Sequence, residues 1–415
     1  MKTKKTQQIK IKKNSKYWKQ IDELSFDVKN LYNLGNYIIR QEFIKTSKDK
    51  EVGIIEEAHW ISYYELDPLL QNSEQYKKVG SQIAQQTLKL LDKNWKSFFK
   101  AIKDYSKHKE KYKGRPKMPG YLNKENGRYV IGLKNTQVKN IDGYVYFAWK
   151  PFKNMNNYFK TIRDERIFSV RIVPRLPDYI LEIIYEVEIP EPNQITTNIA
   201  GIDLGVNNLM TITTNCDIPP IVINGKPLKA MNSYYNKKKA ALQSELMLKT
   251  GNHYSKRIQS LTTKRNSKVD DYIHKASKYL VDWCVDNNID TLVCGHNDGW
   301  KQESDMGKIN NQNFVSIPHS SLMQKIKYKC EDNGIKYIEV DEGYTSGTSF
   351  LDGEEPVKEN YDKSRRVTRG LFVSNEGVEI NADVNGSYQI IKKAFPEAFA
   401  DGIQGVGLHP VIINL

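Results

Sequence analysis

Residues 200–208 read Ala-Gly-Ile-Asp-Leu-Gly-Val-Asn-Asn, an apolar strand pattern that contains a single carboxylate, Asp203. Burying a lone carboxylate in a strand costs several kcal/mol unless the group is paired or binds a metal. Gly201 and Gly205 stand on either side and leave room for another group to approach closely. The stretch therefore predicts a strand that presents Asp203 to a site. The simpler alternative is an aspartate that accepts hydrogen bonds from the amides of a turn.

The chain that follows this stretch has the pattern of an α/β domain. Its expected elements alternate between short apolar runs and amphipathic segments: strands at 199–204, 209–213 and 220–223, a lysine-rich helical segment at 228–285, a strand at 291–294, a helix at 318–333, a strand at 335–341 and a helix near 384–394. Strands followed by alternating helices and strands predict one α/β domain over 196–415.

The first half of the chain has a different pattern. Strand-like runs occur at 8–12, 128–134, 143–149, 167–173 and 178–188. We interpret them as an antiparallel β-barrel over 1–195. The proline-marked segment 189–196 is the linker at its end. Two long amphipathic helices, at 17–46 and about 77–106, interrupt it, so we expect a helical insertion at about 15–120. The predicted class is an α+β multidomain protein.

The composition indicates a nucleic-acid partner. The chain has 415 residues, enough for two or three domains, and a formal net charge of +14. A basic balance of this size is typical of proteins that bind polyanions, although it can also simply keep a protein in solution. The basic N-terminus has no apolar run of a secretory signal, and no segment is apolar enough to span a bilayer. We therefore expect a prokaryotic cytosolic protein near the nucleoid, without a membrane partner.

The four cysteines do not predict a zinc site. They are scattered and form no Cys-x-x-Cys pair. Cys284 and Cys294 have apolar neighbours, so we expect them to be core thiols in a reducing compartment.

A second carboxylate lies near the end of the chain. Residues 380–387 read Ile-Asn-Ala-Asp-Val-Asn-Gly-Ser, and Asp383 opens a helix there. Alone, an Asp in the first turn is more simply a cap or a partner of the helix dipole. Together with Asp203 it indicates a site for Mg²⁺, which prefers oxygen ligands. Two-metal phosphodiester hydrolysis requires such a group of carboxylates.

Basic residues at helical spacing are candidate phosphate contacts. Lys89, Lys93, Lys96, Lys100 and Lys103 share one face of the second helix, preceded by Gln82, Gln85 and Gln86. Lysines in register can follow a phosphate backbone and glutamine can bind a base edge, although a solvated lysine face is equally consistent. The other candidates are Arg115 and Lys117 in the loop 111–120, Lys237, Lys238, Arg257 and Arg265 in the segment 229–275, and Arg365, Arg366 and Arg369.

The two acidic motifs resemble those of the TnpB family, the RNA-guided nucleases of small insertion sequences. Gly-Ile-Asp-Leu-Gly-Val-Asn-Asn at 201–208 is similar to the first segment of their RuvC nuclease, and Asn-Ala-Asp-Val-Asn-Gly-Ser at 381–387 resembles the third. Residues 310–330 and Tyr344-Thr345-Ser346 resemble the helix before the last strand and the Y-T-S segment. Lys-Tyr-Lys-Gly-Arg-Pro-Lys-Met-Pro at 111–119 resembles the basic loop. The resemblance is specific over 199–395 and loose before 190.

This resemblance implies a WED-like barrel with a helical recognition insertion, followed by a RuvC domain of RNase H-like fold. It also implies a guide RNA, double-stranded target DNA beside a short motif, and Mg²⁺- or Mn²⁺-dependent cleavage by what we expect to be a monomer. Three alternatives remain. They are a compact type V CRISPR effector, a nuclease-inactive RNA-guided repressor, and a Holliday-junction resolvase or transposase-like enzyme.

The sequence departs from the family at two places. The family's zinc ribbon carries two Cys-x-x-Cys pairs, but here the insertion at about 346–380 begins Ser-Gly-Thr-Ser-Phe-Leu-Asp-Gly-Glu-Glu, so we predict no zinc. The family's central glutamate ends the strand equivalent to 291–295, where this chain has Cys294-Gly295-His296.

We predict that Glu342 supplies the missing carboxylate, because it stands at the exit of the next strand. Neighbouring strands lie about 4.8 Å apart, so a side chain there can reach the same place. The family includes members in which this glutamate has moved, which supports the placement by resemblance only. The predicted catalytic and metal-binding set is thus Asp203, Glu342 and Asp383. Glu339, Asp341 and Glu303 are alternatives to Glu342, His296 is a candidate accessory group, Asp298 is a less favoured ligand, and Asn297 is most simply a turn residue.

Overall fold

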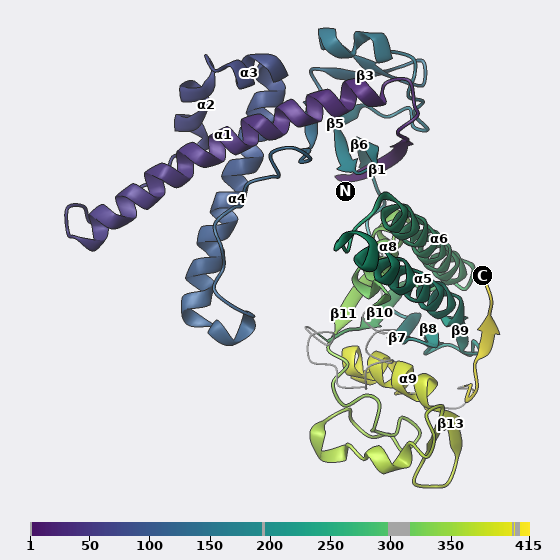
Figure 1. The fold of residues 1–415 in the computed structure, drawn as a ribbon. Helices are drawn as coiled ribbons and strands as arrows, with labels where there is room; N and C mark the ends of the chain where they lie inside the picture. Colours follow the sequence, from purple (N-terminus) through teal and green to yellow (C-terminus); the bar gives the residue numbers. More distant parts are fainter. Residues whose placement is uncertain (1, 193–195, 298–315, 401, 403–406) are drawn as a thin grey trace. The chain divides into compact units, whose positions relative to one another are not determined.

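The structure is a computed structural model that describes residues 2–192, 196–297, 316–400, 402 and 407–415 (Figure 1). Two compact units make it up, Lys2–Glu188 and Ile189–Leu415, and each has its own sheet. The protein is thus an α+β multidomain protein. In the described part of the chain, no helix has the length and apolarity that crossing a membrane requires.

An antiparallel sheet is the base of the N-terminal unit. Its strand order is β1-β6-β5-β2, with β1 and β2 at the two edges, so the described strands form an open sheet. A separate hairpin, β3-β4, turns at Asp142 and Gly143, which both have positive φ, as a two-residue turn of this kind requires. The bounds are Lys2–Ile11 for β1, Ile131–Lys134 for β2, Val138–Ile141 for β3, Tyr144–Phe147 for β4, Ile167–Arg175 for β5 and Asp178–Glu188 for β6.

Helices fill the chain between β1 and β2. They are α1 (Trp18–Glu51), α2 (Tyr63–Leu70), α3 (Glu74–Val79) and α4 (Ser81–Lys107). The expected helices at 17–46 and about 77–106 are confirmed as α1 and α4, except that the second helix begins at Ser81. Gly80, at a φ of +79°, ends α3 and separates it from α4. Sequence periodicity did not separate the two helices because lysines and apolar residues continue at helical spacing across the break.

A row of polar side chains on α1 fixes the chain that returns after α4. Asn36 is fully buried, donates to the carbonyl oxygens of Pro119 (3.0 Å) and Gly120 (3.2 Å), and accepts from the Trp95 indole (3.0 Å). The same face of α1 supplies three more donors to this segment, from Lys29 to Lys124 O, from Asn33 to Leu122 O and from Arg40 to Pro119 O. The segment 119–124 is therefore held along the helix without forming a strand.

The C-terminal unit is built on a six-stranded sheet of order β11-β10-β7-β8-β9-β14. β7, β10 and β11 are parallel, β8 is antiparallel to both β7 and β9, and β14 is parallel to β9. All but β14 correspond to expected strands. The bounds are Ile199–Leu204 for β7, Asn208–Thr214 for β8, Ile221–Asn224 for β9, Thr291–Gly295 for β10, Lys336–Val340 for β11 and Val411–Ile413 for β14.

Helices cover both faces of this sheet (Figure 1). The helices α5 (Lys226–Thr250), α6 (Lys256–Asp286) and α8 (His319–Asp332) lie on one side, and α9 (Ala382–Ala394) lies on the other. Side chains alternate along β7, so Ala200 and Ile202 enter the core under α6 and α8. Ile199 packs against α9, and the same alternation directs Asp203 to the α9 side. Cys284 and Cys294 are buried core thiols, as expected.

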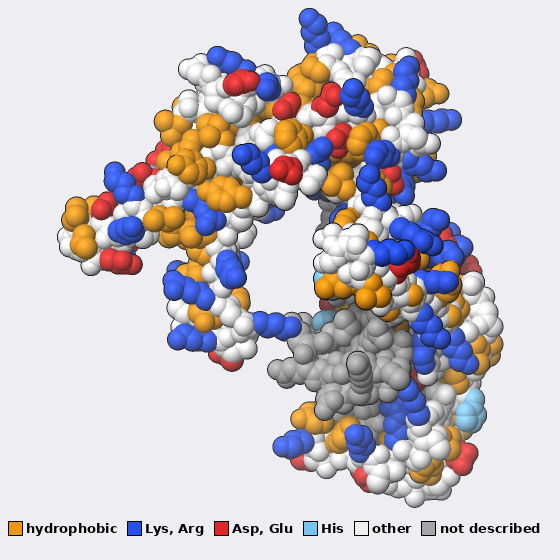
Figure 2. Space-filling view, in the orientation of Figure 1, with side chains coloured by type: hydrophobic (Ala, Val, Ile, Leu, Met, Phe, Trp, Pro, Cys, Tyr) orange, Lys and Arg blue, Asp and Glu red, His pale blue; other side chains and the backbone are white. Residues whose placement is uncertain are grey.

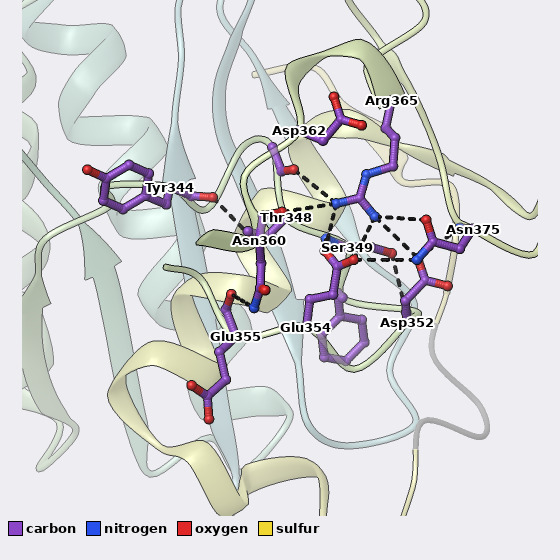
Figure 3. A network of polar contacts seen from close by, with 12 residues as sticks. Tyr344, Thr348, Ser349, Asp352, Glu354, Glu355, Asn360, Asp362, Arg365 and Asn375 are labelled. Atoms are coloured by element: carbon purple, nitrogen blue, oxygen red, sulfur yellow. Dashed lines mark hydrogen bonds and ion pairs between the residues drawn. The ribbon is translucent and has the colours of Figure 1, made fainter. Parts of the chain in front are cut away.

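The segment between β11 and α9 contains the short pair β12 (Leu371–Val373) and β13 (Glu379–Asn381). Its centre is Arg365, whose side chain is 13% exposed and donates to both carboxylate oxygens of Glu354 at 2.8 and 2.7 Å (Figure 3). Arg365 also pairs with Asp352 at 3.6 Å and donates to the carbonyl of Asn360. An arginine–carboxylate network thus organises this cysteine-free segment and engages the Arg365 guanidinium within it.

Candidate functional site

A cavity of about 580 Å³ opens at the carboxyl end of β7, where loops from several elements meet. The elements that reach it are the exits of β7, β10 and β11, the start of α9 and the loop before β12. Its polar lining includes Asp203, Asn208, Thr211, Asn297, Glu342, Thr345, Arg366, Arg369 and Asp383. The carboxyl end of parallel strands is the usual place of a site in α/β sheets.

Asp203 projects from β7 toward α9 and has an unfavourable environment for a charge. Its carboxylate accepts no hydrogen bond from the described residues, so the turn alternative is wrong. Burial, and then the charges of Asp383 and Glu342, raise the pKa of Asp203 well above its usual range, while Arg366 lowers it. A carboxylate without donors and near two others is stabilised by a cation.

Thr211 lies directly across from Asp203 on β8. The two residues are partners in the antiparallel register, so their side chains share one face of the sheet, and both line the cavity. Thr211 is 1% exposed, and its hydroxyl has no hydrogen-bond partner among the described residues. A buried hydroxyl without a partner is rare and needs an explanation, such as an unobserved ion or water.

Asp383 stands in the first turn of α9, but it is not the cap. The cap is Asn381, whose side chain accepts from the amides of Asp383 (3.0 Å) and Val384 (3.2 Å). The Asp383 carboxylate instead accepts from Asn208 Nδ2 at 2.7 Å and pairs with Arg366 at 3.1 Å. The capping alternative for Asp383 is therefore wrong, and its carboxylate is directed to the cavity.

Close packing of α9 on the sheet brings the two aspartates together. Ser387 donates to the Gly201 carbonyl (2.9 Å) and contacts the Thr213 hydroxyl (2.9 Å), and all three lie in the interior. A Cβ on Gly201 would lie 2.6 Å from the Ser387 carbonyl oxygen, so only glycine fits there. One residue earlier on α9, a Cβ on Gly386 would lie 3.1 Å from Asp203 Oδ2. The Asp203 carboxylate thus rests against the first turns of α9.

Glu342 lies two residues beyond β11 and enters the same cavity. Asn297, at the exit of β10, donates to Glu342 Oε1 (3.2 Å) and accepts from the Glu342 amide (3.2 Å). This reciprocal pair fixes both the backbone and the carboxylate. Burial, and then the charge of Asp341, raise the pKa of Glu342 to about 7, although Lys393 lowers it.

Gly295 shows why the strand β10 carries no carboxylate of its own. A Cβ built on Gly295 would lie 3.3 Å from the Cβ of Glu342 and 2.5 Å from Cδ1 of Ile390. Ile390 is buried against β10, so a larger residue at 295 requires the Ile390 side chain to shift. The Glu342 side chain therefore begins beside the position from which a side chain at 295 would extend.

The other candidate carboxylates lie elsewhere. Glu339 pairs in register with Cys294, whose side chain enters the core under α6, so Glu339 faces away from Asp203. Asp341 is exposed and pairs with Lys393 at 3.4 Å. The His296 amide donates to Val340 O, and its ring is not part of the cavity lining. Asp298, Glu303 and residues 310–315 of the family-like segment lie outside the described residues.

The side chains that line the cavity have the right chemistry to bind a divalent cation. They are not arranged to coordinate one in this structure. Three carboxylates and the Thr211 hydroxyl supply the oxygen ligands that Mg²⁺ prefers. However, within the described ranges no three His, Cys, Asp or Glu side chains are close enough together to hold one ion. The ion pair between Arg366 and Asp383 explains part of the separation between the carboxylates. The guanidinium stands where a cation would neutralise Asp383.

The predicted nucleic-acid contacts fall into two groups, and Figure 2 shows many Lys and Arg side chains over the visible face. The exposed ones are Lys89, Lys93, Lys96, Lys100, Arg115, Lys117, Lys237, Lys238 and Arg257. Three are engaged internally. Gln86 packs against Gly132 with a buried amide nitrogen, Gln82 accepts from Thr136, and Arg265 is half-buried and donates to Asn232 and the Ser316 carbonyl.

Sequence reasoning did not place four residues in the cavity, namely Asn208, Thr211, Asn297 and Arg366, although it named Asn297 as a turn residue and Arg366 as a candidate nucleic-acid contact. Asn208 belongs to the motif at 201–208, so its position was visible but its role was not. Thr211 could have been found from register, because it is the strand partner of Asp203. No sequence signal distinguishes Arg366 from Arg365, yet Arg366 enters the cavity and Arg365 does not.

Two family models match adjoining parts of the chain. The model described as a probable transposase, OrfB_IS605, matches residues 182–301, and that of the Cas12f1-like TNB domain matches residues 319–390. The first match includes β7 to β10 with Asp203. The second includes Glu342 and Asp383.

Two curated relatives are similar over part of their length. The CRISPR-associated endodeoxyribonuclease Cas12f1 of Sulfoacidibacillus thermotolerans is 29% identical over 150 residues, 36% of this chain and 33% of the relative. TnpB-like protein ORF457 of Acidianus two-tailed virus is 25% identical over 206 residues, 47% of this chain and 42% of the relative. The matched region is thus less than half of each relative's length.

A solved Cas12f1–sgRNA–target DNA complex aligns with 93% of this chain and 98% of its own, with 17% identity and a TM-score of 0.37. The similarity to a family rests on the sequence matches. They extend in order from β6 through α9 and include a TnpB-like protein and a Cas12f1, so this region of the chain is similar to the TnpB family.

Proposed function

We propose that the protein is an RNA-guided DNA endonuclease that cleaves target DNA beside a short motif by metal-dependent phosphodiester hydrolysis. The observation that carries this proposal is the meeting of Asp203, Glu342 and Asp383 in one cavity. They come from β7, the exit of β11 and the start of α9. Similarity to the TnpB family supports the reaction class, and the net charge of +14 supports a nucleic-acid substrate.

In this proposal residues 196–415, which lie in the C-terminal unit, form a RuvC-like nuclease domain with a zinc-free insertion at about 346–380. Residues 1–195, which include the N-terminal unit, form a WED-like domain with a helical recognition insertion between β1 and β2. Guide RNA pairs with the target, so exposed lysines contact phosphates and need not read bases. The arginine network around Arg365 organises the insertion without zinc.

Asp203, Glu342 and Asp383 would hold Mg²⁺ or Mn²⁺, which supplies an activated water and charge stabilisation for the leaving oxygen. The chain's own groups prepare this site. Asn297 orients the Glu342 carboxylate, Asn208 orients that of Asp383, and the buried hydroxyl of Thr211 has a free donor beside Asp203. Arg366 balances the acidic cavity through Asp383 and can turn to a phosphate when a cation replaces it.

The proposal is tested with the full chain, RNA that co-purifies with it, and DNA that contains the complementary target. We expect cutting only when RNA and Mg²⁺ or Mn²⁺ are both present, and none in chelator. Target binding without cutting at any metal concentration would support the nuclease-inactive repressor. Cutting of branched DNA without RNA would support a resolvase-like enzyme instead. A CRISPR association would show itself as an adjacent repeat array in the genome.

Thr211 offers a second test of the cavity. Replacing Thr211 by Val keeps the shape but removes the hydroxyl, so we expect cleavage to fall about ten- to a hundredfold, as loss of an outer-shell partner does. Stability should stay the same or rise, because the buried hydroxyl has no partner to lose. Cleavage rates over a Mg²⁺ titration and thermal unfolding measure the two effects.

The control for this test is Thr211→Ser, which retains the hydroxyl and should retain cleavage. If Thr211→Val instead lowers the unfolding midpoint and leaves the Mg²⁺ dependence unchanged, the hydroxyl has a structural role and no part in the site.

A further inference from the structure

A second cavity, of about 480 Å³, lies in the N-terminal unit, far in sequence from the carboxylates. It forms where residues 115–118, in the loop after α4, meet side chains of α1 and α4. Its lining consists of Arg40, Phe43, Phe98, Arg115, Pro116, Lys117 and Met118. The cavity thus combines an apolar surface with three cations, and no carboxylate lines it.

The apolar surface is made by aromatic rings in a fixed arrangement. Phe43 of α1 and Phe98 of α4 meet edge to face, with ring centroids 6.5 Å apart. Phe43 also contacts Trp95 and Phe99, and Trp95 is fully buried, so the rings are supported from below. Phe43 and Phe98 remain partly exposed. The face of one such ring offers a flat apolar contact for a nucleobase, and the other ring borders it at nearly a right angle.

The cations stand at the rim of this surface. Arg115 and Lys117 are exposed, and neither is paired with a carboxylate in the described part of the chain. Arg40 is held in place, since it donates to the Pro119 carbonyl and its guanidinium lies 5.1 Å from the Tyr121 ring centroid. The side chains of Arg115 and Lys117, which have no carboxylate partner there, and the held side chain of Arg40 favour binding of an anion at the rim.

The cavity is formed before any ligand binds. The chain that follows it is held along α1 by Asn33, Asn36 and Arg40, which donate to carbonyl oxygens between residues 119 and 122. Asn36 is fully buried and also accepts from Trp95, so the aromatic support and the loop share one hydrogen-bond network. A preformed site loses little conformational entropy on binding.

We propose that this cavity binds one unstacked nucleotide of a single-stranded nucleic acid. The base lies against Phe98 and Phe43, and the adjoining phosphate lies between Arg115 and Lys117. The proposal rests on the proposed function for the origin of the strand, which is either guide RNA or DNA separated from its complement. It does not depend on the carboxylate cavity or on cleavage.

The test measures binding of the full chain to unstructured RNA and DNA oligonucleotides of one sequence, and to a blunt duplex, by fluorescence anisotropy. We compare Lys117→Ala with Lys113→Ala, since both lysines are exposed in the same loop and only Lys117 lines the cavity. We expect Lys117→Ala to weaken single-strand binding and to reduce the salt slope by about 0.7, the value of one phosphate contact on a single strand. Lys113→Ala should change both much less.

Phe98→Leu separates base stacking from charge. It keeps an apolar side chain but removes the ring, so we expect about tenfold weaker single-strand binding with an unchanged salt slope. Because a change at Phe98 can disturb the aromatic cluster, the wild-type protein is also crosslinked to 4-thiouridine or 4-thiothymidine oligonucleotides. The crosslinked peptide should contain residues 40–43 or lie within residues 95–118.

Preference for RNA identifies the guide as the source of the strand, and preference for DNA identifies the separated target duplex; either supports the site. Equal effects of Lys113→Ala and Lys117→Ala, or crosslinks that lie outside both 40–43 and 95–118, would overturn it. Asp203→Asn should leave this binding unchanged. Loss of cleavage with intact binding therefore contradicts only the nuclease, and intact cleavage without this binding contradicts only the nucleotide site.

Discussion

Replacing Asp203 by Asn is expected to abolish cleavage and, in metal-free buffer at pH 8, to leave the thermal unfolding midpoint unchanged or to raise it. The loss of cleavage should exceed about a hundredfold, beyond the ten- to hundredfold effect of losing an outer-shell partner. The gain in stability follows from burial and from the charges of Asp383 and Glu342, which raise the pKa of Asp203. For most structural aspartates, replacement by Asn lowers the unfolding midpoint.

The direction of this effect follows from linkage between protonation and folding. The folded pKa of Asp203 lies above its unfolded value of about 3.9, so its favourable contribution is complete below that pH. That contribution is lost as the pH rises through the raised folded pKa. Above it, folding buries an unfavourable charge, which the amide of asparagine does not carry.

Asp290 provides a matched control in the same unit. Its carboxylate accepts from the amides of Thr197 and Asn198 at 2.9 Å each. Burial raises its pKa, but these hydrogen bonds outweigh burial and hold the pKa below the usual value. Asp290→Asn should therefore lower the unfolding midpoint above about pH 4 and spare the chemistry of the folded protein. If Asp203→Asn behaves like Asp290→Asn, then Asp203 is a structural residue.

The sequence predicted the elements whose periodicity is regular. The strand with Asp203 and the strands β8, β10 and β11 are short apolar runs, and α1 has one apolar stripe. The break between α3 and α4 was missed because a single glycine with positive φ causes it, and glycine also occurs inside helices, as Gly35 does in α1. Short pairs such as β12-β13 have too few residues for a period to be visible.

Polar contacts between distant segments were the least predictable part. Asn33 and Asn36 look like ordinary polar residues of a helix, yet they hold a loop more than eighty residues away. Asn297 follows a strand and looks like a turn residue, but its partner is Glu342, and only the parallel pairing of β10 with β11 brings them together. The residue type shows which side chains can donate such hydrogen bonds. Only the topology of the fold determines which acceptors they reach.

Glu342→Gln is the second substitution with a large expected effect, and Asp341→Asn is its matched control. Glu342 lines the cavity and is fixed by Asn297, whereas Asp341 is exposed and pairs with Lys393. We expect Glu342→Gln to lower guide-dependent cleavage by more than about a hundredfold, since it removes a proposed ligand and not an outer-shell partner. Asp341→Asn should keep the maximal rate. Single-turnover cleavage over a Mg²⁺ titration distinguishes the two.

The pH dependence gives the same pair a second readout. The pKa of Glu342 is raised to about 7, by burial and then by the charge of Asp341, so below that pH a proton competes with the metal. In the wild type, the Mg²⁺ concentration for half-maximal cutting should rise about tenfold per pH unit below 7 if one proton is displaced. Asp341→Asn removes a neighbouring charge and should move this transition to lower pH. Normal cutting by Glu342→Gln, or equal losses in both variants, would show that another carboxylate completes the site.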